Sequence, residues 1–239
     1  ATPWPIFMIV LLGLTYWGSR SIKLVIGTFL AFVFIGYFRM WDETMSTIAI
    51  ILTSVIMSVA IGLPTGIAMS RSDRTQKIVT PILDIMQTMP PFVYLIPIVM
   101  LMGIGKIPGL IAVVIYAIPP LIRLTNLGIR EVDQEALEAA DAFGATKRQK
   151  LFQVQLPLAL PTIFAGINQT IMMALAMVII ASMIGVKGLG QPVLQSIYNQ
   201  YFTKGVLYGL AIVIVAIVFD RVSQSYGQRI QKHRSGKLV

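Results

Sequence analysis

The sequence contains no cysteine and a single histidine, and only 12% of its 239 residues are charged. The absence of cysteine excludes disulfides, thiol redox chemistry and thiolate metal sites. The one histidine, His233, lies in a basic stretch near the C-terminus, so we expect no histidine-based metal or catalytic site. A soluble domain usually carries about 25% charged residues. This chain therefore has too few charges to cover a surface that faces water.

Hydrophobic residues instead make up 56% of the chain, and they gather in long runs. A membrane-spanning helix needs about 20 predominantly apolar residues. Runs of roughly this length lie at about residues 4–18, 22–38, 47–69, 78–102, 109–127, 157–184 and 204–221. The pattern predicts an all-α membrane protein with about seven transmembrane helices, and the lipid bilayer is its first expected partner.

Lysine and arginine are distributed unevenly between the two sides of this expected bundle. With the N-terminus outside, the outer loops hold Arg39, Lys106, Lys187 and Lys204, and the rest of the 19 basic residues lie inside. Because cytoplasmic loops carry the excess of positive charge, we expect the N-terminus outside and the C-terminus in the cytoplasm. The net charge of +9 comes from short loops without interleaved aromatic residues, so no nucleic acid is expected as a partner.

Prolines cluster in the middle runs, with Pro90, Pro91 and Pro97 in the fourth and Pro119 and Pro120 in the fifth. A proline in a helix interior removes a hydrogen bond and kinks the chain. The freed carbonyls need partners in the protein or in water. The kinks either only shape the bundle or mark a moving, solvent-accessible centre, and the sequence leaves both open.

Several polar side chains fall inside the apolar runs, where they are costly and usually face the interior of a bundle. One hypothesis is that they line a pathway for a solute, and the alternative is that they only form hydrogen bonds between helices. The candidates for the pathway are Gln87, Thr88, Tyr94, Asn168 and Gln169. Asp84 and Arg123 are interpreted separately, as a structural ion pair.

The polar segment 128–157 separates the fifth and sixth runs and is expected in the cytoplasm. Residues 133–143 are helix formers without proline or glycine, and Gly144 suits a C-terminal cap. Ala139, Ala140 and Gly144 give this helix a small-residue face. Helices that lie on a membrane surface favour bulky apolar residues, so the small face favours insertion into a groove of another protein.

This segment carries the pattern E-A-A-x3-G-x9-[I/V]-x-L-P, which resembles the EAA loop of permease subunits in bacterial ABC importers. The matching residues are Glu138, Ala139, Ala140, Gly144, Val154, Leu156 and Pro157. The stretches 83–97, 103–105, 118–125 and 156–190 resemble the glycine betaine/proline betaine branch of these binding-protein-dependent permeases. The resemblance covers about residues 45–222.

The resemblance implies the type I ABC importer permease fold, with a five-helix core within residues 46–222. Residues 1–45 would form additional N-terminal transmembrane helices, and 223–239 a basic cytoplasmic tail whose removal after Arg221 should matter little. Two copies of the chain would line one pathway in the bacterial inner (cytoplasmic) membrane. A periplasmic or extracellular substrate-binding protein would deliver the solute.

The same resemblance implies that the EAA helix docks into a groove of a separate cytoplasmic ATPase. The chain has no G-x-x-x-x-G-K-[S/T] phosphate-binding loop, so we expect ATP and magnesium on that partner. We expect no cofactor and no catalytic residue on this chain. The implied function is the import of a betaine-type quaternary amine by alternating access.

The alternatives are a permease of the same architecture for another small solute, such as choline, trimethylamine N-oxide or an amino acid, and a passive osmotic channel. A channel has no need of an EAA helix. An intramembrane enzyme would need a nucleophile–base pair or metal ligands at membrane depth, and the apolar runs contain neither cysteine nor histidine. The spacing shows no aromatic cage for a quaternary ammonium group, so the solute rests on the resemblance alone.

Overall fold

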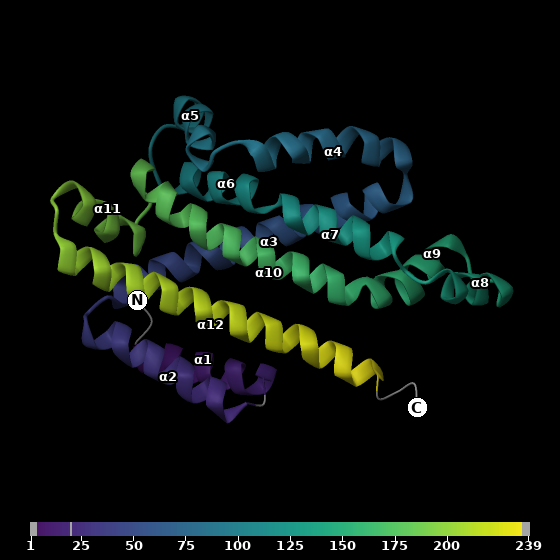
Figure 1. Ribbon diagram of the computed structural model, residues 1–239, viewed down its shortest axis with the longest axis horizontal. Coiled ribbons are helices and arrows are strands. Elements are labelled where there is room, and N and C mark those ends of the chain that lie inside the picture. Colours follow the sequence, from purple (N-terminus) through teal and green to yellow (C-terminus); the bar gives the residue numbers. More distant parts are fainter. Residues whose placement is uncertain (1–3, 20, 236–239) are drawn as a thin grey trace.

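In the computed structural model of the protein, which describes residues 4–19 and 21–235, every regular element is helical (Figure 1). The elements are α1 (Trp4–Ser19), α2 (Ile22–Tyr37), α3 (Trp41–Arg71), α4 (Asp73–Thr88), α5 (Pro91–Met102), α6 (Lys106–Ala117), α7 (Pro119–Arg130), α8 (Gln134–Ala142), α9 (Lys147–Gln149), the π-helix η1 (Lys150–Gln155), α10 (Leu156–Ala181), the 3-10 helix η2 (Ser182–Ile184), α11 (Gly190–Tyr198) and α12 (Phe202–Ser235). The predicted all-α fold is confirmed for the described residues.

The long helices run side by side, and short helices gather at the two ends of the bundle (Figure 1). α8 and α9 lie at one end, called here the α8 end, where α12 also finishes. α5 and α11 lie at the opposite end, called the α11 end, where α1 begins. The first described helix therefore starts, and the last one finishes, at opposite ends of the bundle.

Within the described residues, four helices are long and apolar enough to cross a membrane: Trp41–Arg71, Lys106–Arg130, Lys147–Ile184 and Phe202–Ser225. They correspond to the third, fifth, sixth and seventh apolar runs. α1 and α2 match the first two runs but are shorter apolar helices. A helix of 16 residues is about 24 Å long, which is less than the roughly 30 Å thickness of the hydrocarbon core. The prediction of about seven spans therefore corresponds to four or five full-length spans and two shorter helices.

The fourth predicted run is not one straight helix, because α4 and α5 meet at a bend of 102°. Met89, which precedes Pro90, is extended with ψ 131°, since a residue before proline avoids the helical region. Pro90 is extended as well, and Pro91 starts α5 at its first position, where the missing N–H costs nothing. The two prolines thus divide the run into a broken span or a re-entrant loop.

The centre of the bundle is formed by α10, which packs against α7, α6 and α12, and by α3, which packs against α7. Leu121 and Val113 are fully buried there. Gly66 lets α3 approach α7 closely, because a Cβ atom at this position would lie 2.6 Å from Cβ of Thr125. Close approach through small residues is the usual way in which membrane helices pack.

The predicted domain boundaries fall inside helices. The boundary at residue 46 lies within α3, whose first residue, Trp41, packs edge-on against Phe7 of α1. The boundary at 223 lies within α12, which runs on to Ser235. Residues 223–235 of the predicted tail continue α12 as a helix, since no proline interrupts it, and Ser223 donates a hydrogen bond to Asn168 of α10. The division of the chain at these boundaries stays a prediction.

Candidate functional site

The helix that carries the E-A-A pattern is α8, and both of its ends are capped. At the start, the Asp133 side chain accepts a hydrogen bond of 3.0 Å from the backbone N–H of Glu135. At the end, Gly144 adopts φ +73°, and the N–H of Gly144 and of Ala145 bond to the carbonyls of Asp141 and Ala140 at 2.9 and 3.0 Å. This is the Schellman arrangement, in which a left-handed glycine satisfies the last carbonyls. The predicted helix and its glycine cap are confirmed.

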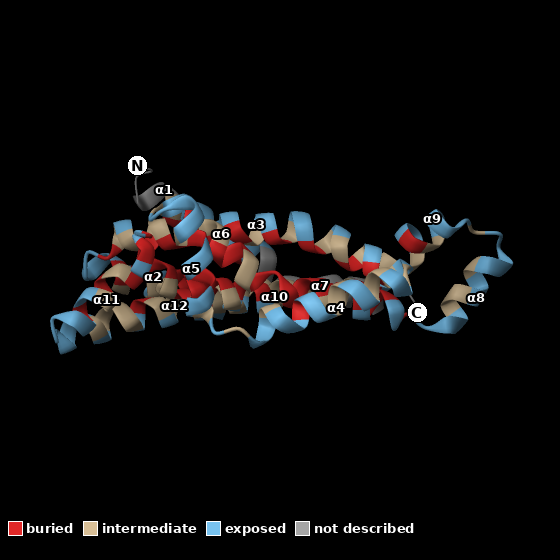
Figure 2. Cartoon of the chain, turned by 90° about the horizontal axis from the view of Figure 1, so that it is seen from above, coloured by how far each residue is buried: buried red, intermediate tan, exposed pale blue. Residues whose placement is uncertain are grey.

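α8 projects from the bundle, and none of its residues is buried (Figure 2). Two contacts attach it to the membrane part. Nζ of Lys150, in η1, lies 2.6 and 2.7 Å from the two carboxylate oxygens of Asp141. The Leu137 side chain packs against an apolar cluster that includes Ile129 of α7 and Leu151 of η1. These contacts join α8 to α7 and to η1, which leads into α10.

The surface that α8 offers to a partner differs in part from the predicted small-residue face. Ala139 and Gly144 are exposed as that prediction requires, and Glu138 is exposed as well. Ala140 is only half-exposed, because it shares a face with Leu137, which turns toward the bundle. The most prominent side chain is Phe143, which is 92% exposed and was missed by the sequence reasoning. Its only signal in the sequence is that it is an aromatic residue within a polar cytoplasmic loop.

A second exposed aromatic residue lies nearby on η1. Phe152 is 56% exposed, and the guanidinium carbon of Arg148 lies 6.0 Å from the centre of its ring. Both line a shallow pocket of about 460 Å³. Aromatic and arginine side chains are frequent anchors at protein interfaces, so these two residues are candidates for the same contact surface as the E-A-A pattern.

The second half of the pattern, Val154, Leu156 and Pro157, lies where the loop becomes α10, and all three side chains are half-buried. Val154 belongs to the π-helix η1, in which the N–H of Leu156 bonds to the carbonyl of Leu151, five residues earlier. Pro157 has no backbone N–H to donate, and in a regular α-helix its ring would clash with the carbonyl four residues earlier. The wider turn accommodates the proline, and π-turns of this kind recur at functional sites.

Two ion pairs tie the helices together on the side of α4. Arg123 bonds to Asp84, the pair expected from the sequence. The sequence reasoning missed Arg130, whose guanidinium lies 2.7 Å from Asp73 and also bonds to the carbonyl of Met69 at 3.0 Å. Arg130 thereby joins α7 to the α3–α4 turn at the α8 end of the bundle.

The five residues predicted to line a pathway fall into two groups. Asn168 and Gln169 line a groove of about 570 Å³ between α10 and α12, together with Asp220. Gln87 and Thr88 are exposed on α4, which packs against α3, α6 and α7. One copy of the chain does not bring the two groups together, so their shared role in a pathway stays a prediction.

The fifth candidate, Tyr94 of α5, is buried and holds the bend between α4 and α5. Its hydroxyl donates to the carbonyl of Met86 in α4, and its ring packs edge-on against Tyr116 of α6, with 5.9 Å between centroids. In this structure Tyr94 makes an interhelical hydrogen bond, the alternative role that the sequence left open.

Comparison with known proteins places the chain in one family. The family described as "Binding-protein-dependent transport system inner membrane component" matches residues 58–232. The glycine betaine/proline betaine transport system permease protein ProW of Salmonella typhimurium is 50% identical over 220 residues, which cover 92% of this chain and 62% of that protein. The glycine betaine transport system permease protein OpuAB of Bacillus subtilis is 50% identical over 218 residues, which cover 91% of this chain and 77% of that protein. The chain thus spans less than two thirds of the length of the first of these relatives.

Among solved structures, the chain is similar to one described as an inward-facing conformation of the MetNI methionine ABC transporter. The TM-score is 0.74 with 22% sequence identity, and the match covers 80% of this chain and 95% of the other. At this identity the likeness shows the fold alone. That fold is the type I ABC importer permease fold, which confirms the fold expected from the sequence.

Proposed function

Because the chain belongs to the family of binding-protein-dependent transport system inner membrane components, we propose that it is the permease subunit of an ATP-driven importer for a betaine-type compatible solute. The observation that carries the proposal is α8. It is a short helix capped at both ends that stands clear of the membrane bundle and carries the E-A-A pattern. A projecting helix of this kind fits the groove of a second protein.

The partner at α8 is proposed to be a cytoplasmic ATPase, which would bind ATP and magnesium. Phe143 would be the apolar anchor of the contact, because it is almost fully exposed and large aromatic anchors dominate interface energies. The Lys150–Asp141 ion pair and Leu137 would carry the displacement of α8 into η1 and α10. The α8 end would then face the cytoplasm and the α11 end the outside, where a substrate-binding protein delivers the solute.

The pathway is proposed to form between two copies of the chain. The polar side chains of Gln87 and Thr88 are exposed on α4, and the groove that holds Asn168 and Gln169 opens to the surface between α10 and α12. Polar groups at membrane depth are costly unless they meet protein or water. A second copy and a water-filled pathway would supply these partners. Closure of the ATPases would shift the pathway between inward- and outward-facing states.

Glycine betaine or a related quaternary amine is the proposed solute, because both curated relatives described above are named for glycine betaine transport. The chain supplies no separate argument for the solute. Choline, trimethylamine N-oxide and amino acids are therefore the alternative solutes to be tested.

The test is to extract the chain from its native membrane in mild detergent, with any subunits that co-purify, and to reconstitute it in liposomes. ATP hydrolysis and uptake of labelled glycine betaine are measured with and without the substrate-binding protein. We expect a co-purifying ATPase whose activity rises with the betaine-loaded binding protein. ATPase activity driven by another solute would refute the betaine assignment, and uptake without ATP would refute the importer assignment in favour of a channel.

A further inference from the structure

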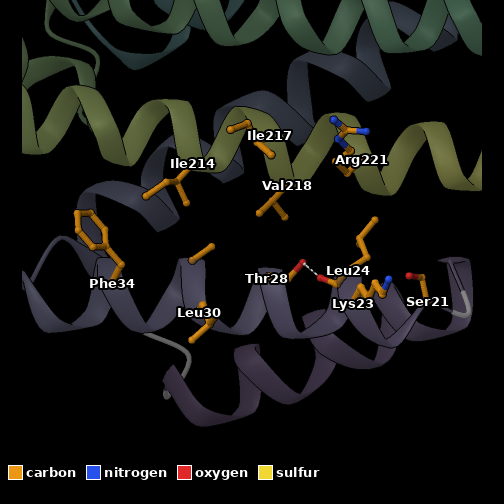
Figure 3. Close-up of a pocket in the computed structure, with 12 residues that line it drawn as sticks. Ser21, Lys23, Leu24, Thr28, Leu30, Phe34, Ile214, Ile217, Val218 and Arg221 are labelled. Atoms are coloured by element: carbon orange, nitrogen blue, oxygen red, sulfur yellow. Dashed lines mark hydrogen bonds between the residues drawn. The ribbon is translucent and has the colours of Figure 1, made fainter.

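A groove of about 630 Å³ runs between α2 and α12, on the side of the bundle away from α4 (Figures 1 and 3). Its walls are mostly apolar, with Leu24, Ala31 and Phe34 from α2 and Ile214 and Val218 from α12. The hydroxyl of Thr28, which also lines the groove, donates to the carbonyl of Leu24 at 2.9 Å and is thereby satisfied. The body of the groove thus suits a hydrocarbon chain.

One end of the groove is basic. Lys23 from α2 and Arg221 from α12 both line that end, and the guanidinium of Arg221 points away from Lys23 (Figure 3). Both side chains are exposed, and none of the described residues that line the groove is acidic. Asp220, next to Arg221 in the sequence, lines the other groove and accepts a hydrogen bond from Gln224 at 2.7 Å. The mouth of the groove therefore holds positive charge that no described carboxylate neutralises.

The length of the groove matches one leaflet of a bilayer. Leu24 and Phe34 are ten residues apart on α2, which is about 15 Å along a helix. This is half of the roughly 30 Å hydrocarbon core. The basic end lies toward the α8 end, where α12 finishes, and so lies at the cytoplasmic surface in the orientation proposed above (Figure 1). A membrane-spanning helix would use the whole thickness, whereas an acyl chain uses half.

We propose that this groove is a binding site for one anionic phospholipid of the leaflet at the α8 end. One acyl chain lies along the groove from Leu24 to Phe34, and the phosphate binds at the basic end, where the exposed Lys23 and Arg221 side chains reorient toward it. Basic pockets between membrane helices on the cytoplasmic side are suited to anionic head groups. Lys23 and Arg221 can reach the phosphate because long basic side chains extend from apolar surfaces to the interface. The site is independent of the solute that is transported.

The test compares two lipids that differ only in head-group charge. The full chain, with any co-purifying subunits, is stripped of lipid in detergent and titrated with dioleoylphosphatidylglycerol or dioleoylphosphatidylcholine, and bound lipids are counted by native mass spectrometry. We expect tighter binding of phosphatidylglycerol, by roughly fivefold for each cation. Lys23→Gln and Arg221→Gln should remove this preference stepwise. Lys204→Gln, an exposed change at the opposite end of α12, is the matched control and should leave it intact.

The apolar part of the groove has its own variant. Gly27 lines the groove, and a Cβ atom there would meet nothing within 4 Å, so Gly27→Leu introduces a side chain into the groove without a clash at its Cβ atom. We expect this change to lower binding of both lipids at least about tenfold. Gly36→Leu is the control, because Gly36 also has open space around it and does not line the groove.

Three outcomes would overturn the proposal. The first is equal affinity of the unmodified chain for the two lipids, and the second is unchanged lipid binding by Gly27→Leu. The third is a change of oligomeric state in Gly27→Leu, which would assign the groove to a second copy of the chain. If Gly27→Leu fails to fold, the Lys23→Gln and Arg221→Gln variants decide the question alone, because both side chains are exposed.

Discussion

Replacement of Gly144 tests whether the shape of α8 is required for coupling to the ATPase. Gly144 holds φ +73°, and a Cβ atom added there would meet nothing within 4 Å. The cost of Gly144→Ala is therefore purely conformational, about 1–2 kcal/mol for an L-residue in the left-handed region. This is a factor of about 5 to 30 in the population of the capped helix. Asparagine tolerates the left-handed region better than alanine, so Gly144→Asn should cost less.

Gly144→Asp separates charge from shape. Aspartate is nearly isosteric with asparagine, but its negative charge at a helix C-terminus is unfavourable by about 0.3–1 kcal/mol. The expected order of uptake per ATP hydrolysed is glycine, then asparagine, then aspartate and alanine. The assay measures solute uptake and phosphate release in the same liposomes, and ATPase retention on the permease measures docking.

The control for this series is Gly13→Ala in α1, where the added Cβ atom also meets nothing within 4 Å. Gly13 lies inside a helix without positive φ, so alanine should be neutral or slightly stabilising there. Equal coupling in the Gly144→Ala, Gly144→Asn and unmodified proteins would refute the reasoning, because it would show that the cap of α8 has no part in coupling.

Three other changes test separate contacts. Phe143→Ala should weaken retention of the ATPase by roughly thirtyfold, as for an aromatic hot spot, and leave the fold intact. A pull-down titration measures this retention, and unchanged retention would exclude Phe143 from the interface. Asp141→Lys should weaken the attachment of α8, although the partly exposed ion pair contributes only about 0.2–1 kcal/mol. The double variant Asp141→Lys with Lys150→Asp should restore uptake per ATP. If it does not, the ion pair does not carry the displacement. Asn168→Leu removes the acceptor for the Ser223 hydroxyl and an amide that lines the α10–α12 groove. Uptake should therefore fall while assembly with the ATPase persists. Normal uptake would show that Asn168 does not line the pathway.

The features that the sequence predicted well are those that depend only on residues close together in the sequence. The limits of α8 follow from helix formers ended by Gly144, and the interruption of the fourth apolar run follows from Pro90 and Pro91. The local pattern says that the run breaks there, but the angle of 102° depends on how α5 packs, including the bond from Tyr94 to Met86. Long-range contacts of this kind leave no periodicity in a single sequence.

The features that were missed depend on which neighbours a side chain meets. Phe143 resembles a buried residue in sequence, and only the way in which Leu137 fixes α8 against η1 leaves Phe143 exposed. Residues 223–235, within the predicted basic cytoplasmic tail, continue α12 as a helix. Ser223 meets Asn168 only because α10 lies beside α12. The composition of these residues does not reveal this contact.

α12 is a long helix without an internal proline, and we expect it to resist bending. At 34 residues it is about 51 Å long, so about 20 Å extends beyond a hydrocarbon core of roughly 30 Å. α3, α4, α5 and α10 each contain an internal proline, and prolines are the usual positions at which helices bend. α12 has none between Phe202 and Ser235. We therefore expect that a rearrangement of the bundle bends the helices that contain an internal proline. α12 should tilt without bending, so that the other helices move relative to it.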